Sequence, residues 1–127
     1  MSSLTEAAVT TYISLPGERD PAVREALIEK CWALDGRLVS PNGGYRGRAQ
    51  LAEMYTRFVA DPQWLRIRVV SVDVRGAMFR VRAFTDYRDG RSLEVFDAGE
   101  VDASGRITTL LTFAGPLVEA GAFSVER

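Results

Sequence analysis

The spacing of apolar residues in this 127-residue chain changes once, and the change divides the sequence into two halves. Up to Val59, apolar residues recur every three or four positions, which is typical of helices with one buried face. From Trp64 onward they alternate with polar residues, which is typical of strands in a half-buried sheet. We therefore predict an α+β fold in which three N-terminal helices pack on a curved antiparallel sheet.

Capping signals place the first two helices. Ser3 and Glu6 have the spacing of a capping box, which predicts a helix over residues 3–15. Asp20 and Pro21 predict the start of a second helix, because aspartate caps free N–H groups and proline is tolerated in the first turn. The expected buried stripe of this helix consists of Val23, Ala26, Leu27 and Cys31.

The segment before the third helix is predicted to lack a long helix or strand. Asp35-Gly36 predicts a tight turn, followed by a short extended piece at 37–40 and a loop at 41–44. The third helix follows and ends at Asp61-Pro62, because proline disfavours helix in the residue before it. Its apolar face consists of Leu51, Met54, Tyr55, Phe58 and Val59.

Turn signals divide the remaining chain into four strands. They fall at Arg75-Gly76, Asp89-Gly90 and Ser104-Gly105, and such short connections make neighbouring strands antiparallel. In the first of these strands the apolar positions change from the Val69 side to the Val70 side. This change predicts either a β-bulge midway along the strand or a change of the element that covers it.

Composition limits the possible functions. The length fits one domain over residues 1–127, and a net charge of -1 without a basic run argues against nucleic-acid or anionic-membrane partners. Histidine is absent, which excludes histidine triads, histidine bases and histidine metal sites. With Cys31 as the one cysteine, we expect a buried thiol, no metal site and no cofactor. The N-terminus lacks a leader pattern and no stretch is long enough to span a bilayer, so we expect a cytoplasmic protein.

One charge stands on an otherwise apolar strand face. Asp97 alternates with Val95, Gly99 and Val101, whereas Glu94 and Glu100 fall on the other face. A carboxyl group in apolar surroundings favours its neutral form, which can donate a hydrogen bond. The alternative is a structural carboxylate that bonds to a backbone N–H group or to Tyr12.

The apolar residues of the last strand and a set of arginines are expected on the outer face of the sheet, opposite Asp97. Residues 106–114 carry apolar side chains on both faces, which predicts that a second copy of the chain covers the outer face as a homodimer. On the outer face, Glu94 and Glu100 are also expected to form cross-strand ion pairs with a row of arginines on the neighbouring strands. These arginines are Arg66, Arg68, Arg80 and Arg82.

The order of these elements resembles that of the nuclear transport factor 2-like (NTF2-like) superfamily, which includes SnoaL-like polyketide cyclases and ketosteroid isomerases. Local sequences agree with this resemblance: Asp20-Pro21, residues 31–33, residues 45–48, and residues 96–100 followed by Gly105-Arg106-Ile107. The resemblance implies a cone-shaped α+β barrel that encloses a pocket for a small apolar molecule, commonly in a homodimer.

The resemblance also implies roles for particular residues. Tyr12 and Asp97 match the paired donors with which ketosteroid isomerases stabilise an oxyanion. The base of those isomerases is replaced by Ser40, which has no histidine or lysine beside it to ionise it. The residues expected to line the pocket are Trp32, Ser40, Tyr55, Phe58, Phe79, Val81, Val95, Leu110 and Thr112, each of which is otherwise explained by ordinary packing or turn formation.

Three functions remain open at this point. The first is a module that binds a small apolar ligand without catalysis, which the missing base favours. The second is an isomerase or cyclase that uses Tyr12 and Asp97 as oxyanion donors. The third is an epoxide hydrolase, whose inward Asp-Arg-Asp set would need Arg80, Arg82 and Asp86 to turn inward, although alternation predicts that they face outward.

Overall fold

The computed structural model describes residues 3–117 and residue 121. Three helices and one 3-10 turn lie mainly in the first half of the chain, and six strands form one sheet. The helical elements are α1 (Leu4–Ser14), η1 (Leu15–Gly17), α2 (Pro21–Cys31) and α3 (Arg48–Ala60). The strands are β1 (Trp32–Ser40), β2 (Gly43–Arg46), β3 (Trp64–Arg75), β4 (Met78–Tyr87), β5 (Ser92–Val101) and β6 (Ile107–Ala114).

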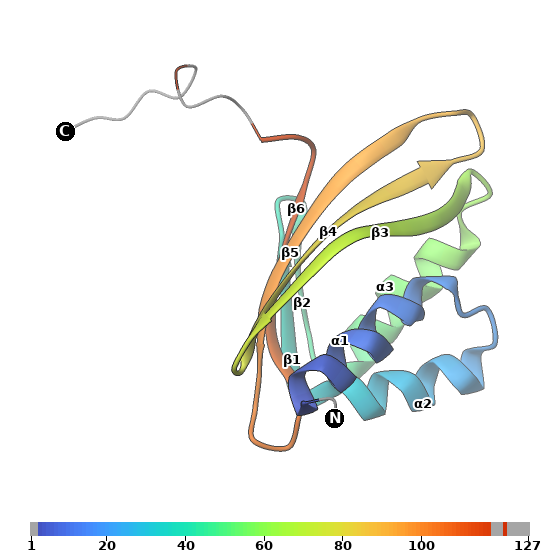
Figure 1. The fold of residues 1–127 in the computed structure, drawn as a ribbon. Helices are drawn as coiled ribbons and strands as arrows, with labels where there is room; N and C mark the ends of the chain where they lie inside the picture. The colour runs from blue at the N-terminus through green and yellow to red at the C-terminus, as the bar shows by residue number, and fades with distance from the viewer. Residues whose placement is uncertain (1–2, 118–120, 122–127) are drawn as a thin grey trace.

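The sheet has the strand order β2-β1-β6-β5-β4-β3 and curves around the three helices, which lie on one side of it (Figure 1). The β1–β6 pair is parallel and the other four pairs are antiparallel. The α+β cone is confirmed, with the difference that the sheet is open at β2 and β3 and does not close into a barrel. None of the helices in the described part of the chain is long and apolar enough to cross a membrane.

Side-chain caps start α1 and α2 as predicted. The Ser3 hydroxyl accepts a hydrogen bond from the Glu6 backbone N–H at 3.0 Å. The Asp20 carboxylate accepts one from the Ala22 N–H at 2.9 Å, with Pro21 as the first helical residue. Each cap satisfies a backbone donor that has no partner inside its helix.

The predicted buried stripe of α2 is wrong except for Cys31. Val23 is 44% exposed, Ala26 is exposed and Leu27 is half-buried, whereas Ile28 and Arg24 are buried. The Arg24 guanidinium donates to the Glu18 backbone carbonyl at 2.9 Å and to the Thr56 hydroxyl at 3.0 Å, which joins α2 to α3. A buried arginine is tolerated here because its donors have partners.

The first strands are longer than predicted. Asp35 and Gly36 lie inside β1 and not in a turn, and Gly43 and Gly44, which were predicted as part of a loop, belong to β2. The register of β1 against β6 shifts between Trp32 and Arg37, so the Asp35-Gly36 signal marks an irregularity within a strand. The pairing of β1 with a strand at the far end of the chain overrides the local turn preference.

The predicted bulge in β3 is confirmed. Val69 lies opposite Ala83 and Ser71 lies opposite Arg82, so Val70 is an extra residue between two paired positions. Beyond the bulge, Val72 lies opposite Val81. The extra residue therefore keeps the apolar side chains of both halves of β3 on the inner face.

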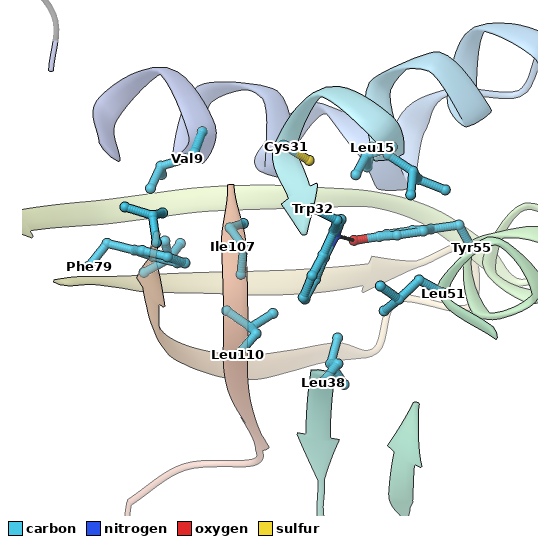
Figure 2. Close-up of a cluster of buried hydrophobic side chains, with 14 of the residues drawn as sticks. Val9, Leu15, Cys31, Trp32, Leu38, Leu51, Tyr55, Phe79, Ile107 and Leu110 are labelled. Atoms are coloured by element: carbon cyan, nitrogen blue, oxygen red, sulfur yellow. Dashed lines mark hydrogen bonds between the residues drawn. The ribbon is translucent and has the colours of Figure 1, made fainter. Parts of the chain in front are cut away.

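Large side chains fill the space between the sheet and the helices (Figure 2). Trp32 at the start of β1 is fully buried, and its indole N–H points to the Tyr55 hydroxyl of α3 at 3.4 Å. Cys31 is buried beside it, as predicted, and burial raises the pKa of its thiol to about 12. The other largest fully buried side chains are Leu15, Ile28, Leu51, Ile107 and Leu110.

Candidate functional site

A row of residues crosses the inner face of the sheet beneath the end of α1. In register, Asp97 of β5 lies between Val81 of β4 and Thr112 of β6. Tyr12, two residues before the end of α1, reaches this row, and its hydroxyl donates a hydrogen bond to the Asp97 carboxyl at Oδ2. The structure thus brings together the two predicted donors, which are 85 residues apart in sequence.

The Asp97 carboxyl is buried and only partly satisfied. The residue is 9% exposed, and its second oxygen, Oδ1, is buried without a hydrogen-bond partner in the described ranges. Burial raises the pKa of Asp97, while the hydrogen bond from Tyr12 and the nearby Thr112 hydroxyl lower it. The Thr112 hydroxyl does not form a hydrogen bond with Oδ1, so this oxygen can still accept one from a ligand.

Aromatic rings hold Tyr12 in place. Its ring stacks on Trp32 with 6.5 Å between centroids and meets Phe79 edge-on at 6.2 Å. Burial, followed by the charge of Asp97, raises the pKa of the Tyr12 hydroxyl well above its usual value. The Tyr12 hydroxyl therefore stays protonated at neutral pH, and its O–H donates a hydrogen bond to Asp97.

The residues predicted to line a pocket divide into two groups. Five of them are fully packed members of the core: Trp32, Tyr55, Phe79, Val81 and Leu110. Phe58, Val95 and Thr112 are half-buried. Val95 lies two residues before Asp97 on β5, and Thr112 is paired with Asp97 on β6. A pocket between the sheet and the helices stays a prediction.

Ser40 lies two strands away from Asp97 in the sheet. It ends β1, and its hydroxyl donates to the Gly43 backbone carbonyl at 3.0 Å in the turn to β2. β6 separates β1 from β5, so Ser40 is roughly 10 Å from Asp97 by strand spacing. Within residues 3–117, the buried carboxyl groups are those of Asp97 and Asp86, and Asp86 lies on the outer face.

The residues needed for the hydrolase hypothesis face outward, as alternation predicts. Arg82 pairs with Glu94 at 2.6 Å, and Asp86 accepts from Arg66 at 2.9 Å and from Arg68 at 3.1 Å. Hydrogen bonds from Arg68, then from Ser92 and Arg66, lower the pKa of Asp86. These groups form ion pairs on the face opposite Asp97 and do not contribute to the Tyr12 site.

The outer face also carries a groove that the sequence analysis missed. Two adjoining hollows, each of about 530 Å³, share the lining residues Asp73, Arg80 and Ala98. Phe113, which is 61% exposed, borders one of them. The signal that could have found it is Ala98, a small side chain on the outer face of β5 that lines both hollows.

No protein family model and no curated protein sequence matches this chain. Solved structures do match it. An isomerase candidate of the SnoaL-like family from Agrobacterium tumefaciens is 22% identical, with a TM-score of 0.78 over 91% of this chain and 100% of that one. A protein with a ketosteroid isomerase-like fold from Catenulispora acidiphila, in complex with trimethylamine, is 15% identical, with a TM-score of 0.71 over 87% of each chain.

A third structure, an NTF2-like protein of unknown function from Mesorhizobium loti, is 15% identical, with a TM-score of 0.69 over 91% of this chain and 97% of that one. The chain thus has the cone-shaped NTF2-like fold. Within that class it is similar to SnoaL-like and ketosteroid isomerase-like structures. At these identities the likeness establishes the fold, and the function has to be argued from the site.

Proposed function

We propose that this protein binds a small, largely apolar molecule at the Tyr12–Asp97 pair on the inner face of its sheet, without catalysing a reaction on it. The observation that carries this proposal is the free Oδ1 of Asp97. A buried polar atom without a partner costs stability, and such a cost is characteristic of sites that a ligand completes. Two half-buried residues adjoin the carboxyl: Val95, two positions before it on β5, and Thr112, its partner on β6.

The absence of a suitable base supports binding over catalysis. Proton transfer requires a base within hydrogen-bond reach of the reacting atom. Ser40 is engaged in a turn, and Asp35, the nearest carboxylate to it in sequence, is exposed. Asp97 is the one buried carboxyl group that the described residues place on the inner face, and it is occupied by Tyr12.

A ketosteroid isomerase-like or cyclase-like enzyme is the second candidate, because the Tyr12–Asp97 hydrogen bond is a specific observation in its favour. A tyrosine and a neutral aspartic acid in a water-poor site can stabilise an oxyanion. In that enzyme the proton would be moved by water or by a group of the substrate. Isomerisation of an apolar β,γ-unsaturated ketone by the wild type, lost in Asp97→Asn, would favour this candidate.

Ligand binding is tested by a thermal-shift screen of small apolar compounds on the wild type, Tyr12→Phe and Asp97→Asn. A compound at about 100 times its Kd is expected to stabilise the wild type by about 2.7 kcal/mol, which raises the Tm by several degrees. Both variants are expected to lose most of this shift. Asp35→Asn, the same change at an exposed position, is the matched control and keeps it. If no apolar compound shifts the wild type, the proposal is wrong.

We also propose that the outer sheet face binds a second copy of the chain. Leu111 and Phe113 are 42% and 61% exposed beside the Ala98 groove, so the face carries both projecting apolar side chains and a hollow that can receive them. A two-fold arrangement would place each copy's Phe113 on the other copy's groove. The arginines and carboxylates around the groove give the same face charges of both signs.

The substitution Phe113→Glu is expected to convert the dimer to a monomer, because it places a charge in the centre of an apolar contact. Light scattering after gel filtration is expected to give about twice 14.0 kDa for the wild type and 14.0 kDa for the variant. Val23→Glu introduces the same charge on an exposed apolar position of α2 and is expected to leave the dimer intact. A wild type of 14.0 kDa at high micromolar concentration would contradict the proposal.

A further inference from the structure

We propose that the polar group of the ligand is a hydrogen-bond donor with a positive charge, so that the site takes a small apolar amine in its ammonium form. This inference rests on the proposed binding function and specifies the ligand class. Its basis is the direction of the hydrogen bond between Tyr12 and Asp97, the charges around Asp97 and the aromatic rings beside it.

The hydrogen bond to Asp97 uses the one proton that Tyr12 can donate. A phenol hydroxyl has a single hydrogen, and that of Tyr12 is directed to Oδ2. An ionised Asp97 then offers only an acceptor, Oδ1, to a ligand. A ketone or an oxyanion would have to break the Tyr12–Asp97 bond or find Asp97 protonated, whereas an N–H donor adds to the existing arrangement.

Among the residues that the structure describes, no positively charged side chain perturbs the Asp97 carboxyl. The titratable groups beside it are Tyr12 from α1 and Tyr55 from α3, and both are neutral at physiological pH because burial raises their pKa values. Its neighbours on β4 and β6 are Val81 and Thr112, which do not titrate.

The arginines of the helical layer that the structure describes as buried or half-buried bond to groups other than Asp97. The Arg24 guanidinium is directed to the Glu18 carbonyl and Thr56, and the Arg48 guanidinium is directed to the Trp32 carbonyl at the end of α2. The arginines of β4 pair with carboxylates on the outer face. An ammonium group on the ligand would therefore supply the counter-charge that the described residues do not place beside Asp97, and charge-assisted hydrogen bonds are the stronger kind.

Aromatic rings beside the carboxyl favour the same ligand class. Tyr12 packs between the Trp32 ring, which it stacks on, and the edge of Phe79. Ring faces attract cations, and the attraction is larger where water is excluded. A carboxylate oxygen next to aromatic rings thus fits an alkylammonium better than a neutral carbonyl compound.

Calorimetric titrations with three probes of similar size test this inference: benzylamine as a cationic donor, acetophenone as a neutral acceptor and phenol as a source of an oxyanion. We expect the wild type to bind benzylamine roughly tenfold or more tightly than acetophenone. Benzylamine affinity is expected to rise as the pH passes through the pKa of Asp97, which burial raises above its usual value, because the amine stays protonated while Asp97 loses its proton. Oxyanion-type binding to a neutral Asp97 would fall over the same range.

Asp97→Asn is expected to lose at least tenfold in benzylamine affinity while acetophenone binding changes little, and Asp35→Asn is the control. The pH profile of the wild type gives the same answer if Asp97→Asn does not fold. Acetophenone or phenol binding more tightly than benzylamine, or benzylamine affinity that falls with pH, overturns the ammonium inference and leaves the proposed function standing. Failure of all three probes and of the wider thermal-shift screen overturns both.

Discussion

Replacing Trp32 by alanine is expected to lower the free energy of unfolding by about 3–5 kcal/mol, the range measured for truncation of large buried aromatic side chains. Trp32 is fully buried at the start of β1, where its ring stacks on that of Tyr12. Its indole N–H donates to the Tyr55 hydroxyl (Figure 2). Its removal leaves a cavity at the centre of the core and deprives Tyr55 of its donor. Chemical denaturation monitored by circular dichroism measures the loss.

Trp32→Phe separates ring packing from the hydrogen bond. The phenyl ring keeps part of the contact with Tyr12, so we expect this variant to lose clearly less stability than Trp32→Ala. A conservative truncation in the same core, Ile28→Val, serves as a reference and is expected to cost about 0.5–1.5 kcal/mol. A Trp32→Ala variant that is no less stable than Ile28→Val would show that the core is not centred on Trp32.

Adding a methyl group at Gly99 is expected to destabilise the fold by about 1–3 kcal/mol through overpacking. A Cβ atom there would lie 2.7 Å from the Phe79 ring and 2.7 Å from the Thr109 backbone carbonyl. The carbonyl belongs to the β5–β6 ladder and cannot move without disturbing it. Because Phe79 packs edge-on against Tyr12, the displaced ring is also expected to weaken ligand binding at Asp97.

Gly17→Ala is the matched control for Gly99→Ala. A Cβ at Gly17 meets nothing within 4 Å, so the same added methyl group is expected to change the free energy of unfolding by less than about 0.5 kcal/mol. Both variants are measured by denaturant unfolding, and the site by the benzylamine titration. Equal stability of the two variants would contradict the close contact between β5, β6 and Phe79.

Local signals predicted the parts of the fold that depend on neighbouring residues. The caps at Ser3 and Asp20, the three turns between β3 and β6 and the bulge at Val70 involve residues close in sequence. They follow from backbone chemistry and from the two-residue repeat of a strand. The same alternation placed Asp97 on the inner face, where the structure has it.

Interactions between segments that are distant in sequence were not predicted from the sequence patterns, or were left with more than one interpretation. The burial of Arg24 depends on Thr56 of α3, and the length of β1 depends on its parallel pairing with β6. For Asp97 the patterns allowed either a neutral donor or a carboxylate tied to Tyr12. The tertiary structure adds the hydrogen bond from Tyr12 to Oδ2 and leaves Oδ1 without a hydrogen-bond partner among the described residues.

The sequence by itself determined the α+β class, the helix starts, the antiparallel strands and the single charge on their apolar face. The tertiary structure decided that the sheet stays open, that the core fills with Trp32 and Tyr55, and that Tyr12 donates to Asp97. The physical reason is the distance along the chain over which each kind of interaction acts. Capping, turns and alternation act over a few residues, whereas the partner of a buried polar atom is fixed only when the whole chain has packed around it.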